Sequence, residues 1–296
     1  MTNEHKQRIL SAIEAYKVDK KLSQNQMANV MGISNAQASS VFNPGKWDNV
    51  SNELWQRLES MFVKHDWVVY ETENFRAIQS VCADSQQFSM NHCISEYTGA
   101  GKTTALESYA KQTPHAYYVL CDQMMTPKDL AREIQRVMGI NVDGNARLMA
   151  IAIVTYLVQQ SRPVILIDEA DKLSDRCLMM LKMIYDRLEN RCGFVTAGTE
   201  VLRERIEKFA RRNKLGYREI ERRFANYKSL VKFDPREKTI QGEILMMCKD
   251  QGITTKGQIT HILKHARHYD DVRKMIVNFQ RLNAKTATAE LEEVAA

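Results

Sequence analysis

The chain has 296 residues, which suits about two domains of roughly 100 to 200 residues each. Hydrophobic residues make up 44% and charged residues 26%, a composition that excludes global disorder. The most apolar stretch, residues 148–158, is shorter than the ~20 residues of a membrane helix. The first twenty residues are polar and lack the apolar centre of a secretory signal. We therefore expect a cytoplasmic protein without a membrane partner.

Two features of the composition bear on function: the cysteines and the distribution of charge. Six cysteines occur without any C-x-x-C pair, which predicts reduced structural thiols rather than a zinc site. The net charge is +6, yet residues 201–232 alone contain eleven Lys/Arg and four Glu, a net charge of +7. Such a segment fits either a solvated helical face or contact with a polyanion or nucleotide, and both interpretations stay open.

Residues 1–63 predict a domain of short helices. Ile9, Ile13 and Tyr16 recur at helical spacing. Three further helices are expected to begin after the serine caps Ser23, Ser34 and Ser51, and Gly32 is expected to end the first of them.

Residues 22–34 resemble the helix-turn-helix of the lambda-repressor type. In that resemblance the second helix enters the major groove. The residues that would then face base edges are Asn35, Gln37, Ala38 and Ser39. However, residues 1–63 carry seven Lys/Arg and six Asp/Glu, which is less basic than a domain that depends on phosphate contacts. A helical protein-contact module is therefore the alternative.

From residue 64 the pattern changes to a linker and then an α/β domain. Residues 64–87 are expected to form a connecting helix, and residues 88–234 the α/β core. Strand-like runs at 88–94, 116–121, 164–167, 194–197 and 227–233 alternate with helical stretches. This alternation predicts a parallel sheet covered by helices.

Residues 235–296 read as a small helical lid with a tail. Helices are expected near 237–249, 256–265 and 270–283. The acidic, Ala-rich tail from Thr286 is expected to fray.

Residues 96–104 carry a phosphate-binding motif between a strand and a helix. Gly99 and Gly101 allow backbone N–H groups to close around phosphate oxygens. Lys102 would reach the β- and γ-phosphates, and Thr103 would offer a hydroxyl to Mg²⁺. The motif expects Gly where the chain has Glu96, a small cost if that side chain points away from the loop. The expected nucleotide-binding residues are Thr98, Gly99, Ala100, Gly101, Lys102, Thr103 and Thr104.

A second motif follows the apolar run 163–167. Asp168 and Glu169 end this run, 66 residues after Lys102. Asp168 can hold the Mg²⁺ water shell, and Glu169 can polarise a water for attack on the γ-phosphate. Together the two motifs predict ATP hydrolysis, with ATP and Mg²⁺ as cofactors.

These residues resemble the AAA+ ATPases. The strand at 194–199 then corresponds to the family's sensor-1 strand. The resemblance implies that Thr199, or Thr196 as the alternative, lies beside the γ-phosphate and reports hydrolysis.

The same resemblance implies two arginine roles. Residues 218–224 would carry an arginine finger that reaches the nucleotide of a neighbouring subunit, with Arg222 or Arg223 preferred over Arg218. Arg273 in the lid would be the sensor-2 arginine, although the usual Gly-Asn-Ala-Arg is absent. A surface salt bridge is the alternative for each of them.

A helix-turn-helix domain, a compact AAA+ module and a short lid together resemble the Mu B family of phage transposition proteins over nearly the whole chain. The resemblance implies a bacterial or phage-encoded ATPase that binds duplex DNA non-specifically and forms a homo-oligomer, as a helical filament or ring. Such a protein selects the transposition target and activates the transposase. Lys128 and Arg132 are candidates for DNA phosphate contacts.

Two other functions fit the same motifs. One is a transcription regulator whose helix-turn-helix reads an operator while ATP gates dimerisation. The other is a helicase loader, which shares the AAA+ core. Little sequence selectivity with steep salt dependence would favour the transposition function over the regulator.

Overall fold

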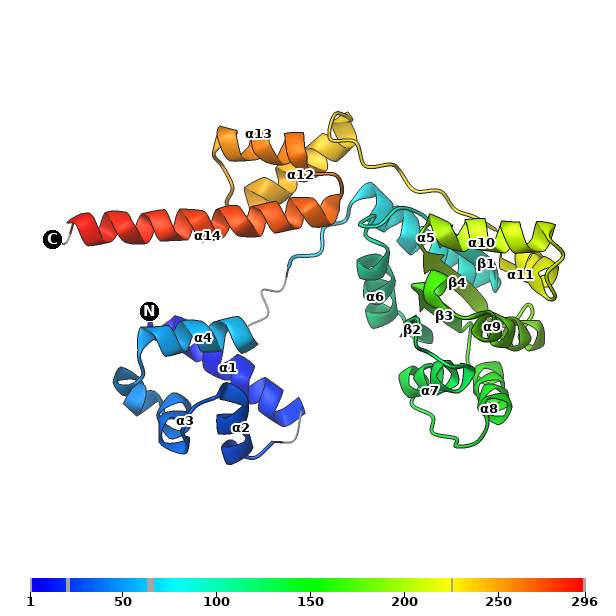
Figure 1. Cartoon of the computed structure of the whole chain (residues 1–296), viewed down its shortest axis with the longest axis horizontal. Helices are drawn as coiled ribbons and strands as arrows, with labels where there is room; N and C mark the ends of the chain where they lie inside the picture. The colour runs from blue at the N-terminus through cyan, green and yellow to red at the C-terminus, as the bar shows by residue number, and fades with distance from the viewer. Residues whose placement is uncertain (1, 20–21, 63–66, 225, 295–296) are drawn as a thin grey trace. The chain divides into compact units, whose positions relative to one another are not determined.

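The computed structural model describes residues 2–19, 22–62, 67–224 and 226–294, with side chains up to residue 283 except those of Asp19 and Ser60. Within it the chain forms two compact units, Met1–Val68 and Val69–Ala296. Figure 1 shows an all-helical N-terminal unit and a second unit built on a sheet.

The N-terminal unit has the short capped helices that the sequence predicts. They are α1 Asn3–Asp19, α2 Gln24–Met31, α3 Asn35–Phe42, the 3-10 helix η1 Pro44–Asn49 and α4 Asn52–Phe62. Ser23 and Ser34 each form a complete capping box with the Gln three residues later. Gly32 ends α2 in the left-handed region, at φ 64°.

A core of its own holds this unit together. Trp55, Ile9 and Leu58 are fully buried in it. Arg57 on α4 donates to the carbonyl of Met31 at 2.9 Å, which satisfies a carbonyl at the end of α2. The α2–α3 turn is therefore fixed against α4.

Unit 2 contains a four-stranded parallel sheet in the order β1-β4-β3-β2. The strands are β1 Asn91–Ser95, β2 Ala116–Leu120, β3 Val164–Asp168 and β4 Gly193–Gly198. Every residue of β1, β3 and β4 is buried, as expected of parallel strands covered on both faces. The predicted fold class, a parallel sheet covered by helices, is confirmed.

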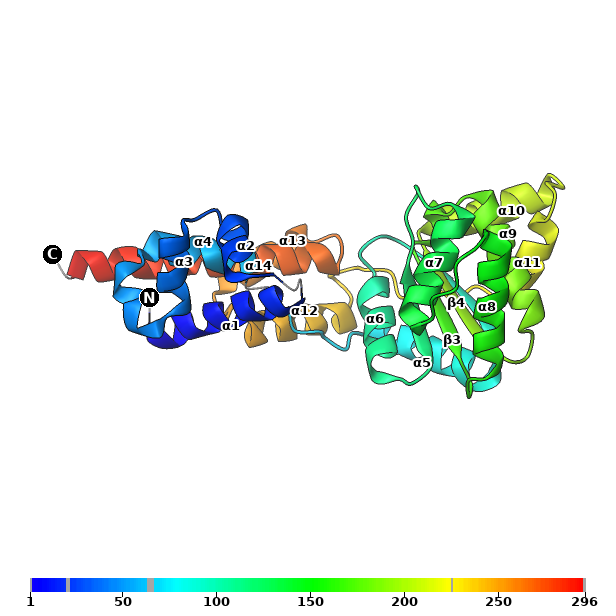
Figure 2. The same ribbon diagram turned by 90° about the horizontal axis from the view of Figure 1, so that it is seen from below.

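Helices pack on both faces of this sheet (Figures 1 and 2). One face carries α5 Glu73–Phe88 and α6 Lys102–Gln112, through an apolar cluster that includes Phe75, Ile78 and Leu106. The other face carries α7 Pro127–Met138, α8 Ala146–Val158, η2 Ala170–Lys172, α9 Asp175–Arg187, α10 Glu200–Arg211 and α11 Tyr217–Phe224. The segment expected as a connecting helix is α5, and it is a layer of the core.

The expected fifth strand at 227–233 is wrong, because the described residues there form one isolated bridge, Cys93 with Tyr227. Just beyond this bridge, side chains bind the backbone groups that a neighbouring strand would otherwise bind. The amide of Val231 donates to Asn74 Oδ1 at 2.8 Å, and its carbonyl accepts from Tyr97 Oη at 2.9 Å. Since these backbone groups are satisfied by side chains, the segment leaves the sheet after one bridge.

The three lid helices are present as α12 Lys238–Asp250, α13 Lys256–His265 and α14 Tyr269–Val294. The tail expected to fray continues α14 as far as Val294. Glu243 on α12 accepts a hydrogen bond from the amide of Glu73 at 2.6 Å, which ties the lid to the start of α5. In the described ranges, every helix is too short or too polar to span a bilayer.

Candidate nucleotide-binding site

The loop between β1 and α6 has the backbone of a phosphate cradle. Gly99 and Gly101 adopt φ of 81° and 86°, a left-handed region that favours glycine. Helix α6 begins at Lys102, so its positively polarised end lies directly after the loop. The loop and the helix start therefore form a site for an anion.

Lys102 folds back across this loop. Its Nζ donates to the carbonyl oxygens of Glu96 at 2.6 Å and Tyr97 at 2.8 Å. Burial lowers the pKa of Lys102, while nearby carboxylates, Asp168 foremost, act to raise it. The ammonium thus lies inside the loop, where phosphate oxygens could replace the two carbonyls.

Glu96, the departure from the motif, points away from the loop. Its Oε1 accepts from the amide of Leu230 at 3.3 Å, and its own amide donates to Gly198 O at 3.2 Å. The carboxylate therefore supports the segment beside β1, while its charge still acts on Lys102 in the loop.

Thr103 and Asp168 meet at the expected metal position. Thr103 Oγ1 donates to Asp168 Oδ2 at 2.7 Å, which joins the start of α6 to the end of β3. Asp168 is only 1% exposed, and Tyr118 Oη also donates to its Oδ2 at 3.0 Å. Burial, followed by the nearby Asp168 charge, raises the pKa of Tyr118, so this hydroxyl stays a donor. A hydroxyl and a carboxylate are hard oxygen ligands that fit Mg²⁺.

Glu169 is placed next to this pair by a left-handed residue conformation, φ 54°. Its amide donates to Asp168 Oδ1 at 2.8 Å, and its carboxylate forms an ion pair with Lys172. The general-base candidate is thus held by a neighbouring ammonium, from which it would have to separate in order to act on a water.

Thr199 is fixed at the end of β4 by two side chains that the sequence did not single out. Its Oγ1 donates to Asp171 Oδ2 at 3.0 Å, and its carbonyl accepts from Ser95 Oγ at 2.7 Å. Gly198 permits this approach, because a Cβ there would come within 2.6 Å of Asp171 Oδ1. The alternative, Thr196, is buried on the sheet face that carries α9 to α11.

The arginine-finger candidates differ in their surroundings. Arg223 pairs with Glu189 at 2.6 Å and Asp186 at 3.1 Å, and only 19% of its side chain is exposed. Arg218 and Arg222 are exposed, one turn apart on α11, and neither has a side-chain partner among the described residues. Only these two could extend towards another molecule without first breaking an ion pair.

The lid contacts the loop through His268. A Cβ on Gly99 would lie 2.7 Å from His268 Cγ, so the imidazole packs against the glycine backbone. The ring is oriented by the amide of Asp271, which donates to His268 Nδ1 at 3.1 Å. Arg273, the expected sensor-2 residue, is exposed on α14. The sequence predicts a role for Arg273 in this part of the lid, whereas it gives no sign of His268.

The DNA candidates on α3 are partly accessible. Asn35 and Ser39 are exposed. Gln37 is exposed too, but its Oε1 accepts from the amide of Ser34 at 3.1 Å in the capping box. Ala38 is 1% exposed, so its expected position at a base edge is wrong: this side of α3 packs into the core of unit 1.

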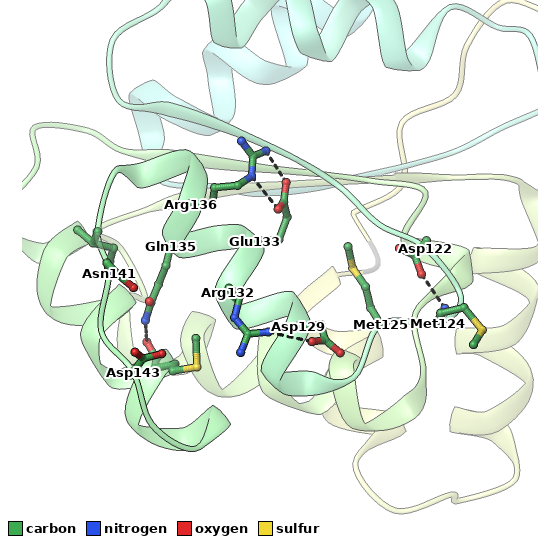
Figure 3. A pocket seen from close by; sticks show the side chains of 12 residues that line it. Asp122, Met124, Met125, Asp129, Arg132, Glu133, Gln135, Arg136, Asn141 and Asp143 are labelled. Atoms are coloured by element: carbon green, nitrogen blue, oxygen red, sulfur yellow. Dashed lines mark hydrogen bonds and ion pairs between the residues drawn. The ribbon is translucent and has the colours of Figure 1, made fainter. Parts of the chain in front are cut away.

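Lys128 and Arg132 lie on α7, where Arg132 pairs with Asp129 at 3.1 Å. Arg132 borders a pocket of about 620 Å³, which Figure 3 shows. The carboxylates that line the pocket are Asp122, Asp129, Glu133 and Asp143. These negative groups make the surface around Arg132 less favourable for a phosphate.

Comparison with known proteins supplies a family for the core. Residues 97–206 match the sequence model of the AAA domain family. No curated protein matches the chain. A crystal structure of a DNA replication initiation factor is similar with 14% identity and a TM-score of 0.49, over 77% of this chain and 66% of that one. AMPPCP-bound DnaA from Aquifex aeolicus is similar with 14% identity and a TM-score of 0.48, over 77% of this chain and 71% of that one.

The chain thus spans just under two thirds of the first of these structures. The family match begins in the phosphate-binding loop, includes β3 with its terminal Asp168, and ends in α10. Residues 97–206, within the α/β core, are thus similar to the AAA domain family.

Proposed function

We propose that the chain is an ATPase that binds duplex DNA and uses ATP·Mg²⁺ as the switch for assembly on it. The observation that carries the ATPase part is the 2.7 Å hydrogen bond between Thr103 and Asp168. It brings the hydroxyl after the phosphate loop to the carboxylate at the end of β3, with Lys102 in the same loop. Phosphate-binding and metal-binding groups therefore converge on one end of the sheet.

Each residue of the site would have its own role in ATP hydrolysis. Thr103 and Asp168 would hold Mg²⁺, which when bound neutralises charge on the phosphates. Lys102 would exchange its two carbonyl partners for phosphate oxygens. Glu169, once separated from Lys172, would accept a proton from the attacking water. Thr199, whose amide is anchored by Asp171 Oδ1, would turn its hydroxyl away from Asp171 Oδ2 to donate to the γ-phosphate.

An assembly-dependent step is expected from Arg222. We expect Arg222→Ala to lower ATP hydrolysis about tenfold or more in the assembled state, because a charge that stabilises the transition state is lost. Hydrolysis measured over a range of protein concentrations checks this. Arg223→Ala is the matched control, expected instead to destabilise α11 against α9. An equal defect of Arg222→Ala in dilute monomer would contradict a role in a neighbouring subunit.

The biological role that we propose is selection of the target for transposition and activation of a transposase. It is supported by the resemblance of the domain combination to the Mu B family and by the capped α2–α3 turn, which presents Asn35 and Ser39 at the surface. Repeating a weak contact along a homo-oligomer multiplies the affinity for DNA. The affinity of unit 1 alone for DNA can then be low, which agrees with its nearly balanced charge.

Electron microscopy of the chain with random-sequence duplex DNA tests this role. Filaments or rings are expected with ATP·Mg²⁺ and not with ADP. Monomers only, under both conditions, would contradict the proposal. A strong preference for one sequence among many duplexes would instead favour a transcription regulator.

A further inference from the structure

The connection between α10 and α11 is strongly basic. Residues 208–215, here called the basic tip, contain Lys208, Arg211, Arg212 and Lys214 and no acidic residue. Figures 1 and 2 show this connection at the outer edge of unit 2. Lys208, Arg211 and Arg212 are exposed, and none of the three forms an ion pair within the described ranges. Lys208 and Arg211 lie one turn apart at the end of α10, and Arg212 is its C-cap.

Outside the basic tip, several positive charges of the basic segment 201–232 are neutralised by ion pairs within the chain. Arg203 pairs with Glu207 at 2.7 Å. Arg205 pairs with Asp175 at 2.6 Å, and Arg223 with Glu189 in the same way. The sequence left open whether the excess charge is a solvated face or a polyanion contact. Among the described residues, the cations of this segment without an ion pair lie at the basic tip, on α11 and after it: Lys208, Arg211, Arg212, Arg218, Arg222, Lys228 and Lys232.

The tip is held rigidly on α9. Tyr217 is fully buried and donates to Asp175 Oδ1 at 2.6 Å. Lys214 pairs with Asp175 Oδ2 at 2.5 Å, and its ammonium lies 4.0 Å from the Phe209 ring centroid. Although burial acts to raise it, hydrogen bonds from Lys214, Tyr217 and Arg205 hold the pKa of Asp175 well below its usual range. The carboxylate thus stays charged and keeps the turn in place.

An apolar side chain stands at the end of this turn. Leu215 is 93% exposed. The next residue, Gly216, has φ 80°, and a Cβ on it would lie 2.4 Å from the terminal carbon of Met179 on α9. The Gly216 backbone therefore packs closely against α9, next to the exposed leucine. A single exposed leucine needs no explanation, but one that follows three exposed cations on an anchored turn matches the wedge-and-cation pattern of minor-groove binders.

We infer that the basic tip is a contact site for duplex DNA. Lys208, Arg211 and Arg212 bind phosphates, and Leu215 lies against a base step in the minor groove. This inference rests on the proposed function, because it assigns the surface by which the ATPase holds DNA. An acidic protein would satisfy the cations equally well, but the outward leucine on a rigid turn favours DNA.

Fluorescence anisotropy on random-sequence duplex, with ATP·Mg²⁺ and 50 to 200 mM salt, tests the phosphate contacts in the full chain. The variant is Lys208→Gln, Arg211→Gln, Arg212→Gln. We expect about tenfold weaker binding or more near 150 mM salt, and a log–log salt slope shallower by about two to three. A charge-matched control, Lys249→Gln, Lys256→Gln, Lys264→Gln on the lid, should keep the parent's slope. Binding of a fluorescent ATP analogue verifies that both variants are folded.

The contact of Leu215 with a base step has its own test, because Leu215→Ala keeps every charge. The parent should raise the fluorescence of 2-aminopurine placed in the duplex, as a partly unstacked base does. Leu215→Ala should lose that rise while keeping the salt slope. An unchanged rise would overturn the role of Leu215.

The outcomes separate this inference from the proposed function. If the parent binds DNA and the triple variant binds it with the same affinity and slope, the tip is not the DNA contact and faces a protein instead. If the parent itself does not bind DNA with ATP·Mg²⁺, the proposed function fails.

Discussion

Lys102→Ala should abolish ATP binding. The ammonium makes two short hydrogen bonds within the loop, and phosphate oxygens are expected to take over both. Hydrogen bonds to a charged group contribute about 1.5 to 3 kcal/mol each, so losing two should weaken binding by about 100-fold or more. Isothermal titration calorimetry with ATP·Mg²⁺ measures this directly.

A neighbouring lysine provides the control for that variant. Lys111 lies on the same helix, is exposed and pairs with Glu107 at 3.5 Å. Lys111→Ala should bind ATP like the parent. Parent-like affinity in Lys102→Ala would contradict the assigned phosphate contact. A parent-like melting temperature would show that the loss in Lys102→Ala is not a loss of fold.

The second large effect is expected from Glu169→Gln. The amide is nearly isosteric but cannot accept the proton of the attacking water, so turnover should fall by about 100-fold or more. Binding should persist, because Asp168 is held by Thr103 and Tyr118 independently of this side chain. Single-turnover hydrolysis and the lifetime of the DNA complex are the measurements, and the DNA complex should last longer because the ATP state persists.

Removing Lys172, the partner of Glu169, separates the catalytic effect from the loss of the ion pair. Lys172→Ala breaks the same pair but keeps the carboxylate, so it should hydrolyse ATP at least as fast as the parent. Equal hydrolysis in Glu169→Gln and the parent would remove Glu169 from its proposed role.

Much of the fold could be predicted because its determinants are local. The capping boxes need only Ser23 with Gln26 and Ser34 with Gln37, three residues apart. Strand β3 is a continuous apolar run from Val164 to Ile167, because helices cover both faces of a parallel sheet.

The predicted fifth strand at 227–233 does not form, because contacts distant in sequence decide the structure of this segment. Leu230 and Val231 have the composition of a strand, but Glu96 and Asn74 bind their amides from 134 and 157 residues away. No pattern within the segment itself indicates that side chains will replace its strand partner.

The candidate site likewise has a part that a local motif predicts and a part that depends on tertiary contacts. The glycines, Lys102 and Thr103 form one local motif, so their convergence with Asp168 could be anticipated. The hydroxyl of Tyr118 on Asp168 and the anchoring of Thr199 by Asp171 depend on tertiary contacts 50 and 28 residues apart. Likewise, Arg222 and Arg223 are equivalent in the sequence until Glu189, 34 residues away, pairs with Arg223.

Calorimetric titration of the parent chain with ATP, with and without Mg²⁺, tests the central claim most directly. We expect a single site with an affinity of ~1 μM to 1 mM, the range of ordinary enzyme substrates, that tightens when Mg²⁺ is added. Thr103→Ala should reduce that tightening, since it removes one of the two metal-facing oxygens. No heat of binding for ATP·Mg²⁺ at millimolar concentration would contradict the nucleotide site and the function built on it.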